Sequence, residues 1–250
     1  MELNTNTLSK LREEYGEAFY LLDSMQFRNN FLELKSTFSS IYPHFNIAYS
    51  YKTNYTPKLC RIVNELGGYA EVVSEMEAEL AIRVGVKPEM IIWNGPIKNQ
   101  NKLEEYLLMG VTVNLDSSEE CQQVRMIANK YPKKIFSLGI RCNFDVRDGV
   151  ISRFGFDVNG KAFWDAFDFV INTKNLRLIN LQCHFAKRQI DYWTARAEGM
   201  VELLDRLNIV PERIDLGGGL FGKMDDSLKD QFNVCIPGYS EYAKAVAVIF

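Results

Sequence analysis

Short apolar runs alternate with amphipathic stretches along most of the chain. Apolar runs begin near residues 46, 69, 90 and 111, and each leads through a turn into a stretch whose apolar residues recur at i, i+3, i+4 and i+7. Strands and helices that alternate at a near-regular spacing indicate stacked β/α units around a parallel sheet. Further strands are predicted at residues 135–142, 176–184 and 213–216, which makes seven. The pattern therefore predicts an α/β fold, a (β/α)8 TIM-type barrel that is incomplete at its last strand.

The segment before the first barrel strand is predicted to form a strand and a helix. An apolar run at residues 18–22 favours the strand, and Asp23 with Ser24 favours the start of an amphipathic helix. We therefore divide the chain into residues 1–45, which lead into the barrel, and residues 46–250, which form the barrel itself.

Composition narrows the class of protein. Apolar residues make up 47% of the chain and charged residues 24%, as in ordinary globular proteins. A net charge of −3 without a basic stripe argues against a nucleic acid partner. The start of the chain lacks the features of a signal peptide and no apolar run reaches membrane-spanning length, so we expect a cytoplasmic protein without membrane contact. Five scattered cysteines without a CxxC pair predict reduced thiols and no metal site.

Lys52 ends the apolar, aromatic run that forms the first predicted barrel strand. The C-terminal ends of barrel strands meet at one mouth, where such folds carry their chemistry. Desolvation at that mouth favours the neutral amine, which is a usable nucleophile. A lysine at a strand end can also simply extend into solvent, so its neighbours decide between the two interpretations.

Other candidate residues lie at or just after predicted strand ends, namely Arg141, His184, Lys187, Gly217, Gly218 and Gly219, and His184 can also be only a structural residue. Glu71 alternates out of the strand predicted at residues 69–73, from where it can point into the mouth. A glycine turn directly after a strand can direct backbone N–H groups at a phosphate, or it can be only a flexible turn. Arg141 can clamp a phosphate or carboxylate, or form an ion pair at the rim. Glu77 lies three residues after Ser74, so a helix capping box explains it without a ligand.

A lysine nucleophile, a phosphate cradle, a histidine and an arginine at one mouth point to pyridoxal 5′-phosphate. A sugar-phosphate aldolase would use the same lysine and phosphate turn. Six segments resemble, in order, motifs of the fold type III, alanine racemase-like pyridoxal phosphate enzymes, specifically the ornithine/diaminopimelate decarboxylase family. They are AYSYKTN at residues 48–54, EVVSEME at 71–77, NGPIK at 94–98, SRFG at 152–155, QCH at 182–184 and DLGGG at 215–219.

The resemblance implies roles for these residues. Lys52 would hold the cofactor as an internal aldimine, and His184 would stack on its ring, so both are expected to be catalytic. The remaining expected cofactor contacts are the three glycines on the phosphate, with Glu71, Arg141 and Lys187 around the cofactor. Glu77 matches an active-site carboxylate of the family. Glu71 stands where the family usually has Asp, and Lys187 falls where many members have Ser, which adds a cation near the phosphate.

The expected function is therefore decarboxylation of an amino acid or an amino-acid-derived intermediate, such as a diaminopimelate-, ornithine- or lysine-like compound or a polyamine or siderophore precursor. An amino acid racemase of the same fold and a non-catalytic binding or regulatory homologue remain alternatives. The family continues into an E-P-G-R strand and a C-terminal β-domain, neither of which occurs in this sequence. We expect this chain alone to be weakly active or inactive, and the resemblance implies a homodimer for the full-length protein.

Overall fold

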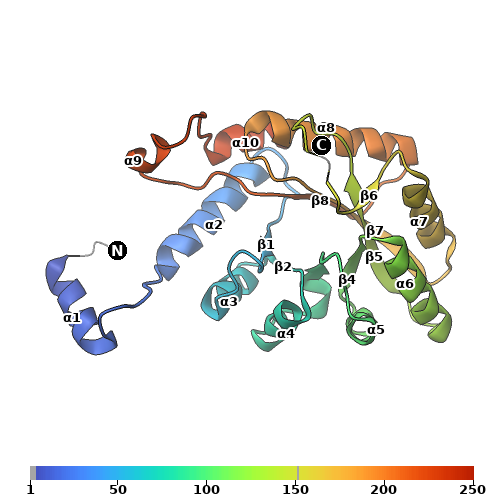
Figure 1. Ribbon diagram of the computed structural model, residues 1–250, viewed down its shortest axis with the longest axis horizontal. Coiled ribbons are helices and arrows are strands. Elements are labelled where there is room, and N and C mark those ends of the chain that lie inside the picture. Colours follow the sequence, from blue (N-terminus) through green and yellow to red (C-terminus); the bar gives the residue numbers. More distant parts are fainter. Residues whose placement is uncertain (1–3, 151) are drawn as a thin grey trace.

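The computed structural model describes residues 4–150 and 152–250, and it contains one parallel sheet (Figure 1). All strand pairs are parallel, and their order in the sheet is β1-β2-β3-β4-β5-β7-β8, with β6 paired to β5. The strands are β1 (Ala48–Ser50), β2 (Tyr69–Val72), β3 (Ile91–Trp93), β4 (Thr112–Leu115), β5 (Phe136–Asn143), β6 (Phe156–Asp157), β7 (Leu176–His184) and β8 (Arg213–Gly217). The seven predicted barrel strands are confirmed.

Helices α3 to α8 lie between successive strands and cover the outside of the sheet, as parallel pairing requires, whereas α1 and α2 precede β1 and α9 and α10 follow β8 (Figure 1). They are α1 (Thr5–Tyr15), α2 (Ser24–Ser39), α3 (Pro57–Glu65), α4 (Glu75–Arg83), the short 3-10 helix η1 (Pro88–Met90), α5 (Gln100–Met109), α6 (Ser118–Lys130), α7 (Lys161–Asn172), α8 (Ile190–Leu207), α9 (Asp226–Lys229) and α10 (Tyr239–Val246). No helix among the described residues is long and apolar enough to cross a membrane.

The predicted strand at residues 18–22 is wrong, because these residues form no strand in the structure. A strand needs a neighbour for its N–H and C=O groups, and this exposed segment has no neighbouring strand. The helix predicted from Asp23 and Ser24 is confirmed as α2, whose first turn donates from Gln26 N–H to the Asp23 carboxylate at 2.9 Å. The chain also forms α1, which the sequence did not predict and which buries none of its residues.

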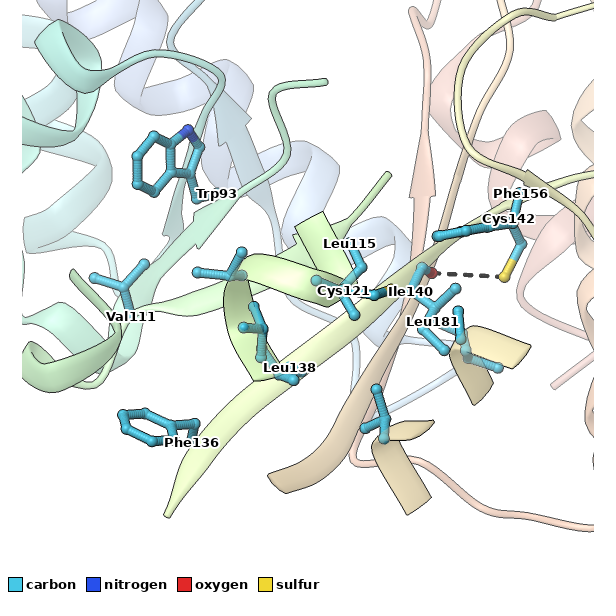
Figure 2. Packing of buried hydrophobic residues seen from close by; sticks show 14 of the residues in the cluster. Trp93, Val111, Leu115, Cys121, Phe136, Leu138, Ile140, Cys142, Phe156 and Leu181 are labelled. Atoms are coloured by element: carbon cyan, nitrogen blue, oxygen red, sulfur yellow. Dashed lines mark hydrogen bonds between the residues drawn. The ribbon is translucent and has the colours of Figure 1, made fainter. Parts of the chain in front are cut away.

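The main apolar core lies between the sheet and the helices that surround it. Figure 2 shows part of this packing, where Leu115, Leu138, Ile140 and Leu181 from neighbouring strands meet, all completely buried. The Cys142 thiol in the same layer donates to the carbonyl of Ile140 at 3.5 Å. This layer fixes the strands in register, and so fixes the side chains at their C-terminal ends.

The inside of the barrel is polar, unlike the apolar filling usual for this architecture. Asn180 Nδ2 donates to Asn114 Oδ1 at 2.9 Å, and Asn114 donates in turn to Asn94. Gly139 makes room for this chain of amides, since a Cβ at Gly139 would lie 1.8 Å from Asn114 Oδ1. The core thus positions a line of amides that leads towards β2.

The sheet is not closed, since β1 and β8 pair with one neighbour each and not with each other in the described residues. Helices bridge this seam instead. Phe38 of α2, Trp193 of α8, and Tyr242 and Val246 of α10 pack into a second apolar cluster. The helix before β1 and the helix after β8 therefore hold the two edge strands close together.

Candidate active site

Lys52 lies in the turn directly after β1, at the barrel mouth. Tyr51 N–H donates to the Glu71 carbonyl at 2.9 Å, and the Tyr51 side chain is completely buried. Lys52, on the opposite face, is exposed and makes no hydrogen bond or ion pair with any described residue. The expected desolvation of this amine is wrong for the chain as described, because its neighbours leave it open to water.

His184 lies at the end of β7, opposite Gly217 of β8 in the sheet register. A Cβ at Gly217 would come within 2.8 Å of His184 Nδ1, so only glycine leaves the ring its present position. Burial, and then the positive charges of Lys52, Arg141 and Arg196, lower the pKa of His184 to about 4. The imidazole is therefore neutral at neutral pH, and these charges act on one shared site.

Arg141 forms the rim ion pair that the sequence left as one of two interpretations. Its Nη1 donates to Asp116 Oδ2 at 2.8 Å, and the other oxygen of Asp116 accepts from Gly155 N–H at 2.9 Å. The guanidinium also lies over the Phe154 ring, 5.0 Å from its centroid. Gly155 has φ of +77°, and a Cβ there would lie 2.9 Å from the Arg141 carbonyl. The SRFG segment is thereby fixed onto the end of β5.

Glu71 points into the barrel, where its partner is an amide. Asn94 Nδ2 donates to Glu71 Oε1 at 3.1 Å, which ends the chain of asparagines described above. The Asp215 carboxyl lies on β8, and burial, and then the charge of Glu71, raise its pKa to about 7. The Asp215 carboxyl is therefore partly protonated near neutral pH.

Glu77 caps the start of α4. Its Oε2 accepts from Val73 N–H at 2.8 Å, and its own N–H donates to Ser74 Oγ at 3.3 Å. Because the carboxylate is only 5% exposed, this cap accounts for its position, as the sequence predicted. The geometry offers no contact between Glu77 and the mouth residues.

The same cap recurs at α6, where Glu120 reaches back to Asp116 N–H at 2.8 Å. There it also binds Lys98 Nζ at 2.9 Å in a buried ion pair. Lys98 comes from the NGPIK segment, so that segment serves to link two strand ends.

The glycine turn ends β8 and lies beside the turn after β7. Gly218 has φ of +133°, and a Cβ there would lie 2.5 Å from Arg196 Nη1. Lys187, in the neighbouring turn, is exposed. The structure thus brings the predicted Lys52, His184 and glycine turn to one mouth, with Glu71 below them in the barrel.

Sequence reasoning missed two charged residues near the mouth. Asp116 follows β4 directly, and an acid at a strand end was a usable signal. Arg196 lies three residues after Trp193 and four before Met200, on the buried face of α8. A cation inside an apolar stripe was the signal there. Among described residues, no group of His, Cys, Asp and Glu side chains gathers to hold a metal ion.

These features define a barrel with an amine, a neutral imidazole and an anion cradle at one mouth, a set that suits pyridoxal phosphate. Residues 27–248 match the family described as pyridoxal-dependent decarboxylase, pyridoxal binding domain, and the chain belongs to this family. The predicted family and its cofactor, pyridoxal phosphate, are thus confirmed. The glycines also fit this site locally, because a Cβ at Gly217 would collide with His184 and one at Gly218 with Arg196, so only glycines let the turn lie this close to both side chains.

Similar proteins carry decarboxylase names. Diaminopimelate decarboxylase of Aquifex aeolicus is 27% identical over 229 residues, which cover 86% of this chain and 53% of that protein. The diaminopimelate decarboxylase of Methanothermobacter thermautotrophicus is 31% identical over 137 residues, covering 55% of this chain and 30% of that protein. The crystal structure of diaminopimelate decarboxylase from M. jannaschii superposes with a TM-score of 0.83 at 22% identity, covering 96% of this chain and 58% of that one. The predicted incomplete barrel is confirmed by this match, and the chain spans about half the length of the relatives it matches.

Proposed function

We propose that this chain is the cofactor-binding part of a pyridoxal phosphate-dependent amino acid decarboxylase, with residues 46–250 as the binding barrel. The observation that carries the proposal is the meeting of Lys52, His184 and the Gly217–Gly219 turn at one mouth. Lys52 is exposed and has no hydrogen-bond or ion-pair partner among the described residues, so its amine is available for covalent attachment. Membership in a pyridoxal-binding family supports the same assignment.

Each of these residues has a task that follows from its setting. Pyridoxal phosphate, when bound, takes up the electron pair that remains at Cα when carbon dioxide leaves. Lys52 would supply the amine to which the cofactor attaches. His184 is neutral, so its ring can pack flat against an aromatic ring without adding charge. The glycine turn accommodates the phosphate because no side chain projects from it.

The other predicted contacts are secondary in this proposal. Arg141 acts by holding the SRFG segment in place through Asp116, and Lys187 adds positive charge at the rim. Glu71 accepts a hydrogen bond from Asn94 inside the barrel, and its charge acts on the buried Asp215 carboxyl. Glu77 serves as a helix cap.

The substrate class is proposed from the relatives. Several are named diaminopimelate decarboxylase, and structures of relatives contain L-lysine, putrescine or cadaverine. We propose a diamino acid or a close derivative as the substrate, and a homodimer as the active assembly.

Carbon dioxide release from meso-diaminopimelate, L-ornithine and L-lysine tests this function, measured with cofactor added. Lys52→Ala should abolish release, whereas Lys58→Ala, an exposed lysine on α3, should leave it unchanged. Loss of optical activity without carbon dioxide would identify a racemase. Because this chain alone is expected to be weakly active or inactive, the assay uses the full-length protein, in which cofactor binding without any turnover of amino acids would favour a non-catalytic homologue.

A further inference from the structure

Arg196 is a buried cation that forms no salt bridge in the described part of the chain, where Asp148 acts on it only without direct contact. Its side chain is 0% exposed, although it lies on the apolar face of α8. The buried cations Lys98 and Arg141 each bind a carboxylate, whereas Arg196 forms no ion pair with a described residue. Its Nε is buried and also lacks a hydrogen-bond partner. A buried charge without a salt bridge is unfavourable, so this arrangement would gain from a negative group in direct contact.

The contacts of the guanidinium are all with backbone carbonyls and aromatic rings. Nη1 donates to Gly217 O at 3.3 Å, and Nη2 donates to Phe185 O at 3.1 Å and to Lys187 O. The Trp193 ring lies 4.3 Å from Cζ. The carbonyls belong to the turn that follows β7 and to the last residue of β8. Arg196 therefore lies between these two segments and fastens both to α8.

The glycine turn lies directly on this guanidinium. At Gly218 a Cβ would approach Arg196 Nη1 to 2.5 Å and the Phe185 carbonyl to 2.6 Å, so only glycine permits the contact. The N–H groups of Gly219 and Leu220 donate to no acceptor within the described residues. Backbone N–H donors without acceptors, next to a buried cation without a salt bridge, are two elements of an anion site.

We propose that Arg196 is the positioning residue of a phosphoryl site, and that its charge, acting from beneath the Gly217–Gly219 turn, gives the site its preference for a dianion. The proposal deepens the function proposed above, in which the phosphoryl group belongs to the cofactor. Unlike that function, binding at the phosphoryl site does not depend on Lys52. Two exposed cations in the neighbouring turn, Lys187 and Arg188, are the competing source of attraction.

Inorganic phosphate tests the site without the cofactor. Thermal unfolding of the Lys52→Ala chain is compared in phosphate and in chloride at equal ionic strength. Phosphate should raise the midpoint by about 4 °C or more when it is well above its dissociation constant. Arg196→Met should abolish this rise. Arg206→Met is the matched control, because Arg206 lies on the same helix and also donates to a carbonyl, that of Val158.

The second readout is the ratio of affinities for pyridoxal phosphate and for pyridoxal, which lacks the phosphate. Arg196→Met should lower this ratio roughly tenfold or more, because one buried positive charge near the dianion is lost. Arg196→Lys loses the geometry that lets a guanidinium donate to three carbonyls. Because it keeps the positive charge, it should retain most of the ratio. Equal losses in the Lys and Met variants would show a purely structural role and overturn the proposal.

Further outcomes also decide the matter. If phosphate does not raise the unfolding midpoint of the Lys52→Ala chain, the proposal is overturned whatever the variants do. It is also overturned if Lys187→Met loses the phosphate effect while Arg196 is intact. If Arg196→Met does not fold, the phosphate-induced rise of the midpoint is compared between Arg196→Lys and Lys187→Met instead. If phosphate binds through Arg196 while Lys52 proves unreactive, this site stands and the proposed function fails.

Discussion

The buried cations on two sides of the barrel mouth have different partners. On the β4–β5 side, Lys98 binds Glu120 at 2.9 Å and Arg141 binds Asp116 at 2.8 Å. On the β7–β8 side, Arg196 is equally buried but has only carbonyl partners among the described residues. The first side is complete in itself, and we propose that the second is completed by an anionic ligand.

This difference separates polar groups that hold the scaffold together from polar groups that are available to a ligand. A paired buried charge fixes neighbouring segments to each other, as Lys98 does for the ends of β3 and β4 through the carbonyls of Gly95 and Asn114. Such a pair has little left to offer a ligand. The β7–β8 side instead combines an unmatched cation, a neutral imidazole and a turn without side chains.

The largest expected effect on stability comes from breaking the buried ion pair on the β4–β5 side. Lys98→Met leaves Glu120 buried and unpaired, which should cost about 3–5 kcal/mol of unfolding free energy. Urea unfolding measures the loss. Lys102→Met removes a surface pair with Glu105 and should cost less than about 1 kcal/mol. Similar losses in the two variants would contradict the burial argument.

The next largest effect is expected from a substitution in the Gly217–Gly219 turn. Gly218→Ala must accommodate φ of +133° and a contact with the guanidinium of Arg196, which we expect to cost about 1–3 kcal/mol together with most of the cofactor affinity. Gly222→Ala, a few residues on, meets no atom within 4 Å and should change neither quantity. Cofactor titration alongside urea unfolding distinguishes the two positions. Undiminished cofactor binding in Gly218→Ala would remove the turn from the site.

A smaller effect concerns His184 and pH. Its pKa of about 4 in the folded chain lies below the ordinary 6.5, so on acidification the unfolded chain takes up this proton first. Stability from the neutral ring is therefore present above pH 6.5 and is lost as the pH falls towards 4. His184→Gln should flatten the pH dependence of unfolding in this window. His44→Gln leaves a single imidazole, whose NMR titration gives the pKa directly; a value near 6.5 would contradict the account.

The smallest effect is expected at Glu77. Glu77→Gln keeps an oxygen that can accept from Val73 N–H, so it should cost less than about 1 kcal/mol and leave carbon dioxide release unchanged. Unfolding and activity are measured on the same preparation. A large loss of activity with unchanged stability would restore Glu77 as an active-site carboxylate.

Sequence periodicity was enough for the barrel, because each strand and helix follows its own local pattern. The error at residues 18–22 arose because an apolar run does not say whether a pairing strand exists. The capping role of Glu77 could be predicted because its partners lie within four residues of it. The link of Arg141 to Asp116 could not, because 25 residues separate them and only the sheet register brings them together. Arg196 escaped notice because an arginine is ordinarily counted as surface.

The central claim is that Lys52 is the attachment point of the cofactor. Incubation with pyridoxal phosphate, reduction with borohydride and peptide mass spectrometry would locate the modified amine. We predict a phosphopyridoxyl group on the peptide that contains Lys52, and its loss in Lys52→Ala but not in Lys58→Ala. Labelling that is confined to Lys187 or another lysine, with Lys52 unmodified, would contradict the account.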